Sequence, residues 1–368
     1  MRSFFYICLL AAFVFIVGAC KKTKPPSETR SFLLGVTPWP PDFTKKGYDL
    51  AYDFIDEHCD LVSHHFDDGI PWNEAYYGLP MPKKFQEDLD RRKQKTPTGK
   101  KILLSVAPLK ISRKEKAGYY SSPDPSSPVS EWEKKNFRDS TVIQAYVNFI
   151  TQLIVELKAD YINYGVESNS SEWSENDFDD YRFFLSQVYL KLKGLYPDRP
   201  FFISFMVSPE KKFLETAKLL ESYTDWITLS AYPYTYIGSV VHGSSSPDLI
   251  PENLFPSYRN INSSKPFAFA ETGYIAEDLE MNGVSKEGNT QWQEDYLQYL
   301  FKFCQKNEAE FIIWFCAYDY DDAVNTFGAI GYTDQLVMLW KDTGLFDEKL
   351  IPRPSLHTWE AWRKLPIQ

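Results

Sequence analysis

The chain has 368 residues, and its 40 Lys and Arg against 50 Asp and Glu give a formal net charge of -10. An acidic protein is a poor partner for polyanions, and no stripe of basic residues interleaved with aromatic ones occurs, so nucleic acid binding is not expected. Aromatic residues make up 17% of the sequence. This content suggests exposed aromatic side chains that suit the apolar faces of sugars. A hydrophobic core that is rich in aromatic residues is the alternative explanation.

The first 20 residues indicate export. Arg2 supplies a positive charge, and an almost unbroken apolar run follows from Phe4 to Val17. This run is shorter than the roughly 20 residues that a membrane span needs, and small residues follow it, which is the layout of a secretory signal.

The end of this segment, Val17 to Cys20, resembles a bacterial lipobox. The resemblance implies cleavage before Cys20 and lipidation of its thiol. We therefore expect a lipoprotein signal peptide over 1–19 and a lipidated polar tether over 20–30. The protein would then be exported and held by its lipid in a bacterial cell envelope, at the outer membrane or facing the periplasm. A plain signal peptide with an incidental cysteine, or an uncleaved anchor, is the alternative.

Three cysteines remain in the body of the chain, Cys59, Cys304 and Cys316. Their odd number and wide spacing argue against a disulfide framework, so we expect small, buried apolar side chains. The sequence has no cluster of Cys and His with zinc spacing, and we predict neither a metal nor a cofactor.

Short apolar runs then alternate with helical patterns along the chain. Strands are expected at 31–36, 59–65, 101–107, 160–166, 200–206, 225–231, 266–272 and 310–316. Between most of them apolar residues recur at intervals of three and four, as from Val142 to Leu157, which indicates amphipathic helices. Continuous apolar strands are typical of a parallel sheet that is covered on both faces.

Eight such units favour the α/β class and a (β/α)8 TIM barrel, formed as a single domain by residues 31–368. The long inserts at 66–100 and 108–139, after strands 2 and 3, are interpreted as loops with short helices. A doubly wound open sheet is the runner-up, weakened because no glycine-rich loop follows the first strand. A closing helix is expected to begin near Ser355 as its N-cap.

Two of the apolar strands end on a glutamate. Glu167 follows strand 4 in DYINYGVE, and Glu271 ends strand 7 in FAFAETGY. Chemistry in such barrels takes place at the carboxyl ends of the strands, so the two side chains could meet across the barrel mouth. Paired carboxylates suit glycoside hydrolysis, in which one acts as a proton donor and the other as a nucleophile or base.

Several motifs carry a family resemblance. The motifs are a Glu after strand 4, YPY after strand 6, ETGY on strand 7, and IIWF with a following Asp at strand 8. Together they resemble those of the clan A glycoside hydrolases, and the endo-β-1,4-galactanases are among the members with the more similar motifs. The resemblance covers about residues 160–320 and thins over 30–140. It implies that Glu167 is the acid/base and that Glu271 is the nucleophile.

The resemblance also implies a contact between Tyr232 and the nucleophile, and a sugar site floored by Trp314. In two places the sequence departs from the family. Val166 stands where the clan usually has an Asn that grips the sugar 2-hydroxyl. No arginine ends strand 2, where many members place one near the nucleophile, and His64 and His65 occupy that stretch instead.

The substrate-binding candidates are Trp39, His65, Tyr232, Tyr234, Trp314 and Asp319. Each has a structural alternative. Trp39 could pack against the prolines around it, Trp314 could belong to the core, and the two tyrosines could serve packing. Asp319 lies in YDYDD, whose spacing matches no calcium loop and which a solvated acidic loop would also explain.

These observations predict a glycoside hydrolase that cleaves a β-linked poly- or oligosaccharide with retention of configuration. The alternative is a non-catalytic, glycan-binding surface lipoprotein on the same barrel, which Val166 motivates. A metal-dependent hydrolase would need histidines at several strand ends, and the chain has five in all. The sugar, the linkage, endo or exo action and the oligomeric state are not indicated by the sequence.

Overall fold

The computed structural model describes residues 28–120, 129–170, 173–238, 242–281, 283–329 and 335–368. The expected signal peptide, Cys20 and residues 20–27 of the expected tether lie outside the described residues. Within those ranges, no helix combines the length and hydropathy that a membrane crossing needs.

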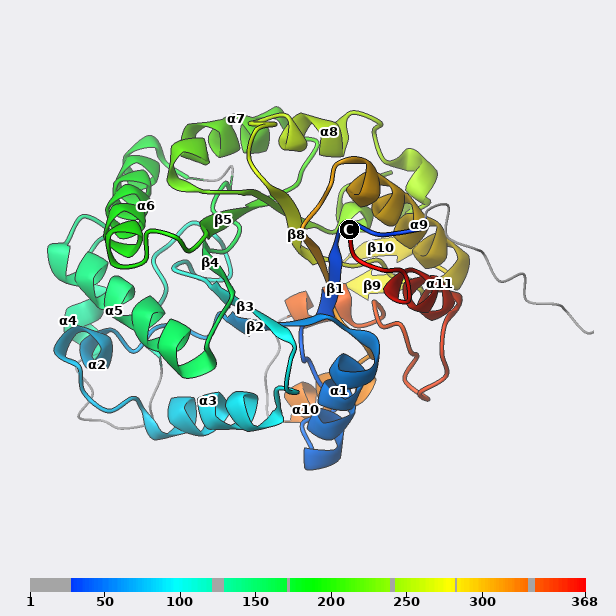
Figure 1. The fold of residues 1–368 in the computed structure, drawn as a ribbon, viewed down its shortest axis with the longest axis horizontal. Helices are drawn as coiled ribbons and strands as arrows, with labels where there is room; N and C mark the ends of the chain where they lie inside the picture. The colour runs from blue at the N-terminus through cyan, green and yellow to red at the C-terminus, as the bar shows by residue number, and fades with distance from the viewer. Residues whose placement is uncertain (1–27, 121–128, 171–172, 239–241, 282, 330–334) are drawn as a thin grey trace, which may run out of the picture.

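The core of the fold is a closed barrel of eight parallel strands (Figure 1). In spatial order the strands are β1-β11-β8-β6-β5-β4-β3-β2. Their bounds are β1 Leu33–Val36, β2 Leu61–Phe66, β3 Lys101–Val106, β4 Tyr161–Gly165, β5 Phe201–Met206, β6 Ile227–Ala231, β8 Phe267–Thr272 and β11 Phe311–Trp314. Each lies within or overlaps a strand expected from the sequence, so the (β/α)8 barrel is confirmed.

A ring of helices surrounds the barrel (Figure 1). It consists of α1 Lys45–His58, α3 Lys83–Lys95, α5 Ser140–Leu157, α6 Glu175–Leu195, α7 Lys211–Leu220, α8 Leu254–Arg259, α9 Thr290–Lys306 and α11 Pro354–Arg363. The loops after strands add α2 Trp72–Tyr77, α4 Val129–Glu133, α10 Asp321–Ala329 and the 3-10 turns η2 Pro233–Thr235, η3 Pro247–Leu249 and η4 Gln335–Trp340. The 3-10 turn η1 Glu221–Tyr223 continues α7 before β6. A small sheet that the sequence did not predict joins β7 His242–Ser244, β10 Val284–Glu287 and β9 Leu279–Met281.

Local signals explain where the helices begin. Helix α5 starts at Asp139, whose side chain accepts a hydrogen bond from the backbone N–H of Thr141, and its apolar stripe is buried. Such a cap satisfies one of the free N–H groups of the first turn. The expected N-cap of the last helix is wrong. Arg353 is the N-cap, Pro354 is the first helical residue, and Ser355 is buried within the helix.

The barrel interior follows the two-residue alternation of strands. Its floor is an apolar cluster formed by Leu61, Leu103, Phe202, Ala268, Phe311 and Ile313. Two residues further along three of these strands, Ser63, Ser105 and Ser204 form a buried polar layer. A polar layer above an apolar floor provides hydrogen-bonding groups beneath the mouth of the barrel.

The two ends of the described chain meet. Arg30, from the expected tether, is buried, and its guanidinium pairs with Asp60 at 2.6 Å. Its backbone bridges to Ile367 near the C-terminus, which lies beside β1 in Figure 1. The folded body therefore includes Arg30. Cys59, Cys304 and Cys316 are free and buried, as expected.

Candidate functional site

A cavity of about 510 Å³ opens at the carboxyl ends of the strands, and both Glu167 and Glu271 line it. The loops after β1, β2, β3 and β11 and one face of helices α1 and α3 supply most of its walls. The two glutamates that the sequence placed at strand ends therefore share one cavity.

Glu271 owes its orientation to an irregularity in β8. Ala268 faces the barrel interior, so strict alternation would turn residue 271 outward. The register shifts between Leu229 and Ser230 of β6, which places Glu271 opposite Ser230. An extra residue in one strand re-aims the side chains that follow it, and such bulges are frequent beside active sites.

Two neighbours hold the Glu271 carboxylate. The Tyr232 hydroxyl donates to its Oε1 at 2.5 Å, and the His65 Nδ1 lies 3.4 Å from its Oε2. Burial by itself raises the pKa of Glu271, but the hydrogen bond and charge of His65, the Tyr232 hydroxyl and the charge of Arg113 together hold that pKa below its ordinary value. The sequence-based contact between Tyr232 and this glutamate is present.

His65 lines the same cavity, and its acidic neighbours favour its protonated form. Burial lowers its pKa, but hydrogen bonding and charge from Asp67 and Glu271 outweigh that effect and raise the pKa of His65 to about 10. Its Nε2 lies 3.7 Å from the Asp67 carboxylate. The neighbouring His64 faces the opposite side of β2, where its Nε2 contacts the Thr96 hydroxyl at 2.8 Å. The adjacent histidines thus have different roles.

Glu167 leaves β4 in the left-handed region, with φ 50. Its backbone N–H donates to the Ser204 hydroxyl at 3.0 Å. Its Oε1 accepts a hydrogen bond from the Ser230 hydroxyl at 2.6 Å, and its Oε2 accepts one from Arg113 Nε at 2.7 Å. Ser204 of the polar layer therefore holds the backbone of Glu167, and Ser230 with Arg113 holds its carboxylate.

Arg113 and Asp67 were missed by sequence reasoning. Arg113 lies in the insert after β3, yet it is buried and donates to both Asp67 carboxylate oxygens at 2.9 and 3.0 Å. The pKa of Asp67 is held well below its ordinary value, because Arg113 and His65 outweigh the effect of burial. Asp67 directly follows β2, so the rule that identified the glutamates, a carboxylate at the end of an apolar strand, could also have identified Asp67. Arg113 lies in a loop away from any strand end, where this rule does not apply.

Aromatic side chains form the wall on the β1 and β11 side of the cavity. Trp39 lies 6.0 Å from Phe315 and 5.8 Å from Tyr320, measured between ring centroids. Trp340 packs against Phe315 at 6.0 Å. All four residues line the cavity. Trp39, one of the expected substrate contacts, therefore lines the cavity.

No family model and no curated protein sequence matches this chain. Solved structures do match it. A family GH5, subfamily 18 enzyme from Bifidobacterium longum subsp. longum, in complex with Manβ1-4GlcNAc, is 15% identical, with a TM-score of 0.60 over 92% of this chain and 80% of that one. The GH53 catalytic domain of Ignisphaera aggregans is 15% identical, with a TM-score of 0.57 over 90% and 96% of the two chains. An exo-β-1,4-mannosidase from Opitutaceae bacterium strain TAV5 is 14% identical, with a TM-score of 0.59 over 93% of this chain and 60% of that one.

The structural neighbours are clan A glycoside hydrolases. At these identities the likeness establishes the fold, a closed parallel barrel of eight strands. Among the described residues, no asparagine lines the cavity that holds the two glutamates. Val166 is buried, and the amide of nearby Asn169 bonds to backbone atoms of Met206 and Phe213.

Three expected substrate contacts are corrected by the structure. Trp314 is fully buried outside the barrel floor, and its indole N–H donates to the Thr343 carbonyl at 2.8 Å. Alternation along β11 places Phe311 and Ile313 inward, so Phe315 rather than Trp314 reaches the cavity. Tyr234 is also fully buried, and its hydroxyl donates to the Leu339 carbonyl at 2.8 Å.

Asp319 is the third correction. It is buried, accepts a hydrogen bond from the Gly344 backbone N–H at 2.8 Å, and pairs with Arg353 at 2.6 Å. Burial raises the pKa of Asp319 to about 7, although Arg353 opposes that shift. These contacts connect the loop after β11, which carries Phe315 and Tyr320, to the segment after Trp340. Asp319 therefore stabilises the aromatic wall without lining the cavity.

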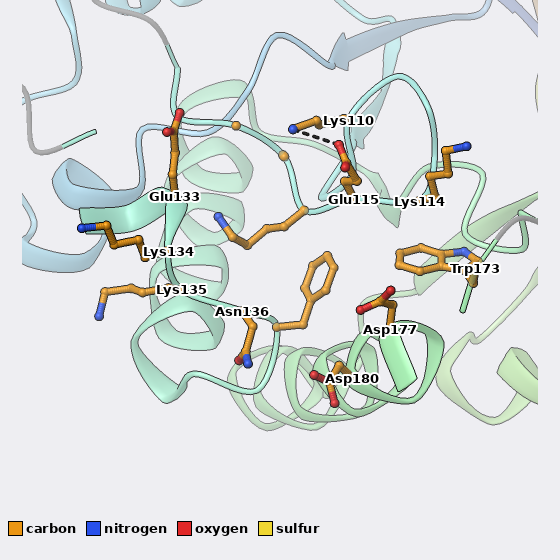
Figure 2. Close-up of a pocket in the computed structure, with 14 residues that line it drawn as sticks. Lys110, Lys114, Glu115, Glu133, Lys134, Lys135, Asn136, Trp173, Asp177 and Asp180 are labelled. Atoms are coloured by element: carbon orange, nitrogen blue, oxygen red, sulfur yellow. Dashed lines mark hydrogen bonds and ion pairs between the residues drawn. The ribbon is translucent and has the colours of Figure 1, made fainter. Parts of the chain in front are cut away.

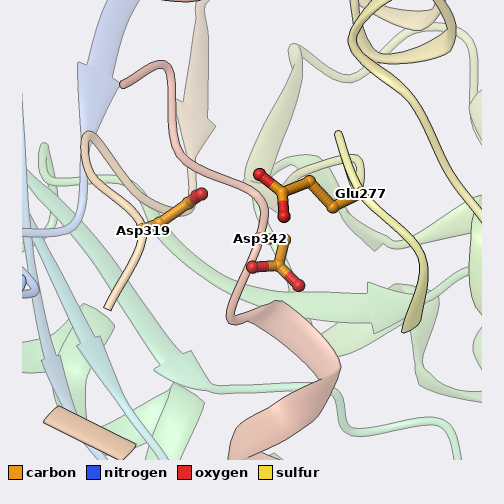
Figure 3. Close-up of side chains that lie close together, drawn as sticks. All are labelled: Glu277, Asp319 and Asp342. Atoms are coloured by element: carbon orange, nitrogen blue, oxygen red, sulfur yellow. The ribbon is translucent and has the colours of Figure 1, made fainter. Parts of the chain in front are cut away.

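Asp319 also belongs to the acidic cluster of Figure 3. One carboxylate oxygen from each of Glu277, Asp319 and Asp342 lies within 4.8 Å of the other two. Two cations of the chain already pair with them: Arg353 with Glu277 and Asp319, each at 2.6 Å, and Lys341 with Asp342. The cluster is therefore explained as a structural ion-pair network behind the site.

A second cavity, of about 540 Å³, lies beside the loop of residues 110–118 (Figure 2). Lys110, Lys114 and Glu115 of this loop line it together with Trp173. Trp173 is buried and stacks on Tyr181 with ring centroids 5.0 Å apart. Residues of the insert after β3 therefore line both cavities, and Ile111, Arg113 and Tyr120 line the one that holds the glutamates.

Proposed function

We propose that this protein is a glycoside hydrolase that cleaves a β-linked poly- or oligosaccharide with retention of configuration. The observation that carries the proposal is the pairing of Glu167 and Glu271 in one cavity at the carboxyl ends of a closed barrel. The neighbouring structures support a glycosidase fold, and one of them was determined with Manβ1-4GlcNAc.

Glu271 is the proposed nucleophile. A nucleophilic carboxylate must stay ionised, and the contacts with Tyr232 and His65 lower the pKa of Glu271 in the required direction. In the first step a carboxylate oxygen of Glu271 forms a bond to the anomeric carbon, and the bond to the leaving oxygen breaks. A glycosyl ester on Glu271 results.

Glu167 is the proposed acid/base. It delivers a proton to the leaving oxygen in the first step, and it removes a proton from the water that cleaves the glycosyl ester in the second. Two inversions at the anomeric carbon give net retention. The aromatic wall with Trp39 and Phe315 offers ring faces against which a sugar can pack.

A panel of β-linked oligosaccharides and activated aryl β-glycosides tests the proposal. The wild type is expected to release sugar from at least one of them, and Glu271→Gln is expected to lose that activity while remaining folded. Glu167→Ala is expected to retain turnover of aryl glycosides with good leaving groups, and added azide should accelerate it by forming a β-glycosyl azide. Wild-type rates in Glu271→Gln would contradict the assignment.

The second candidate is a non-catalytic glycan-binding protein. Two observations favour it: Val166 stands in place of the clan asparagine, and Arg113 already pairs with Glu167 at 2.7 Å. Calorimetric titration with the same panel separates the candidates. Binding of an oligosaccharide with no product after prolonged incubation would favour the second.

We infer a lipid anchor at Cys20 as well. The support is the sequence layout of residues 1–19 and the lipobox resemblance. Expression in a bacterial host with radiolabelled palmitate should label the wild type and should fail to label Cys20→Ser. Equal labelling of both would contradict a lipid at this position.

A further inference from the structure

The cavity that holds the two glutamates extends beyond them. Part of its lining belongs to the helices α1 and α3, which lie outside the barrel (Figure 1). We call this part the distal end of the cavity, and its residues are Tyr48, Phe66, Asp68, Asp88, Arg91 and Arg92. Within the described part of the chain, the side chains that bond to Glu167 and Glu271 all lie elsewhere. The distal end is therefore space that the two-glutamate chemistry itself does not use.

Contacts within the protein hold both arginines of the distal end in place. The guanidinium carbon of Arg91 lies 4.1 Å from the centroid of the Tyr48 ring, and that of Arg92 lies 4.5 Å from the centroid of the Phe66 ring. Asp88, one helical turn earlier in α3, accepts hydrogen bonds from Arg91 Nη2 and Arg92 Nε. Because stacking and ion pairing already restrict both side chains, a ligand that bonds to them costs little further conformational entropy.

Donors and an acceptor remain unused at the distal end. Among the described residues, the two terminal nitrogens of Arg92 and the Nη1 of Arg91 have no partner, and neither have the carboxylate oxygens of Asp68. The two oxygens of Asp88 are both occupied by the arginines. The distal end thus offers guanidinium donors together with one carboxylate acceptor.

Asp68 projects into a concave part of the surface. Its side chain is exposed. Even so, desolvation by the surrounding protein raises the pKa of Asp68, the charge of Asp67 raises it further, and the charge of Arg92 opposes the shift. A group that is accessible and at the same time partly desolvated lies between walls rather than on a convex surface. The effect of Arg92 also places that arginine close to Asp68.

Charge decides which ligand suits the distal end. The two arginines there are balanced by Asp68 and Asp88. Over the whole cavity, five Asp and Glu side chains face three arginines and His65 among the described residues. An anionic ligand would add to this excess of negative charge in a partly desolvated space, and a cationic ligand would meet Arg91 and Arg92. A neutral ligand that both donates and accepts hydrogen bonds fits these groups best.

We propose that the distal end is a second sugar subsite, in which hydroxyl groups of a neutral sugar donate to Asp68 and accept hydrogen bonds from Arg91 and Arg92. The inference rests on the proposed function, because this sugar belongs to the chain that is cleaved. A hydroxyl group is both donor and acceptor, so neighbouring hydroxyls of one ring can bond to a carboxylate and a guanidinium together. The substrate is then a neutral oligo- or polysaccharide, and affinity increases with chain length until the distal end is filled.

Calorimetric titration with oligosaccharides of increasing length tests the subsite. The protein carries Glu271→Gln, so that the probes are not consumed. The probes are β-1,4-linked gluco-, manno- and galacto-oligosaccharides, from the monosaccharide to the hexasaccharide. Affinity for at least one series should increase with length, and Asp68→Ala should remove about 10-fold of that increase, because hydrogen bonds to a charged group are lost. Asp68 is exposed, so this variant is expected to fold.

Two further variants locate the effect on α3. Arg92→Gln should also reduce the increase in affinity with length. Lys93→Gln is the matched control, because it removes a positive charge from the next position of the helix, where Lys93 pairs with Glu156 and does not line the cavity. It should leave the whole increase in place. Weakening of all lengths to the same extent in Asp68→Ala and Arg92→Gln is the mark of a purely structural role and would overturn the proposal.

The preference for a neutral sugar has its own test. β-1,4-Linked oligomannuronates differ from the manno-oligosaccharides only by a carboxylate in place of the primary alcohol, and sulfated manno-oligosaccharides carry a different anion. Both should bind more weakly than the neutral chain of the same length. Tighter binding of either acidic series, lost in Arg92→Gln, would show an anion site and would overturn the assignment.

The outcomes separate the subsite from the proposed function. If affinity increases with length and Asp68→Ala reduces that increase, but the wild type releases no product, the proposed function fails while the subsite stands. If the wild type cleaves an oligosaccharide whose affinity does not change with length, the subsite fails while the proposed function stands. Binding of none of the probes would contradict the subsite.

Discussion

Single side chains in this protein differ in role although they are close in sequence. Tyr232 and Tyr234 come from the same YPY segment, but Tyr232 donates to Glu271 and Tyr234 donates to a backbone carbonyl behind the cavity. His64 and His65 differ in the same way, because adjacent residues of a strand face opposite sides. For the histidines the face of the strand decides the contact, whereas Tyr232 and Tyr234 lie beyond the end of β6, where the turn η2 sends their side chains to different partners.

The tyrosine pair provides a matched prediction. Tyr232→Phe removes a hydrogen-bond donor from the proposed nucleophile and should lower kcat by about 100-fold, the usual scale for a lost donor at a developing charge. Tyr234→Phe should leave kcat unchanged and lower the free energy of unfolding by about 1–2 kcal/mol, because the Leu339 carbonyl loses its partner in the interior. Steady-state kinetics and urea unfolding check both. Equal loss of kcat in the two variants would contradict the assignment of the site.

At the scale of the elements, strand ends position the chemistry. The end of β4 fixes the backbone of Glu167, and the irregularity in β8 turns Glu271 into the cavity. The apolar strands and the glutamates that end them could be predicted from the sequence. The choice of Phe315 over Trp314 was also available, because alternation from Phe311 assigns it to the inner face. The register shift beside β8 depends on how this strand pairs with β6. The burial of Arg113 depends on its contacts with Asp67 and Glu167, which come from other strand ends. Neither feature leaves a pattern in a single sequence.

Gly165 tests the importance of the β4 end. A Cβ added there would lie 2.6 Å from Ile203 Cγ2 and 2.8 Å from the Ser168 hydroxyl. Gly165→Ala should therefore displace the strand end, lower the free energy of unfolding by about 1–3 kcal/mol and reduce kcat through Glu167.

The control is Gly194→Ala in α6, where an added Cβ meets nothing within 4 Å. It should keep kcat and raise the free energy of unfolding by about 0.5–1 kcal/mol, because alanine favours the helix. Kinetics and unfolding curves of the two variants distinguish a crowded strand end from a general intolerance of larger residues. Full activity in Gly165→Ala would show that the β4 end does not position Glu167.

At the scale of the whole molecule, the charged side chains of the cavity also contribute to the stability of the folded protein. His65, Asp67, Arg113 and the two glutamates form one connected set of ion pairs in the interior of the barrel mouth. The pKa of His65 is raised from its ordinary value of about 6.5 to about 10. A group whose pKa is raised on folding stabilises the folded state fully below its unfolded pKa, and this contribution is lost as the pH rises through the folded value.

The stability of the wild type should therefore decline between about pH 6.5 and pH 10 through the loss of the His65 charge. His65→Gln lacks this group, so its melting temperature should start lower at pH 6.5 and fall less steeply over the same window. Thermal unfolding of both proteins at steps of half a pH unit measures the difference between their melting temperatures. The contributions of other titrating groups such as Asp319 are the same in both proteins and cancel in this difference. Parallel curves would show that His65 is not held as a cation.

The most direct measurement of the central claim is the identity of the residue that becomes covalently bound to sugar. An activated 2-deoxy-2-fluoro β-glycoside of the sugar that the wild type hydrolyses should trap the first intermediate, and mass spectrometry of the digested protein should locate the added mass. We predict a glycosyl ester on Glu271, absent in Glu271→Gln. An ester on another residue, or an unlabelled enzyme that inverts the configuration of its substrate, would contradict the account.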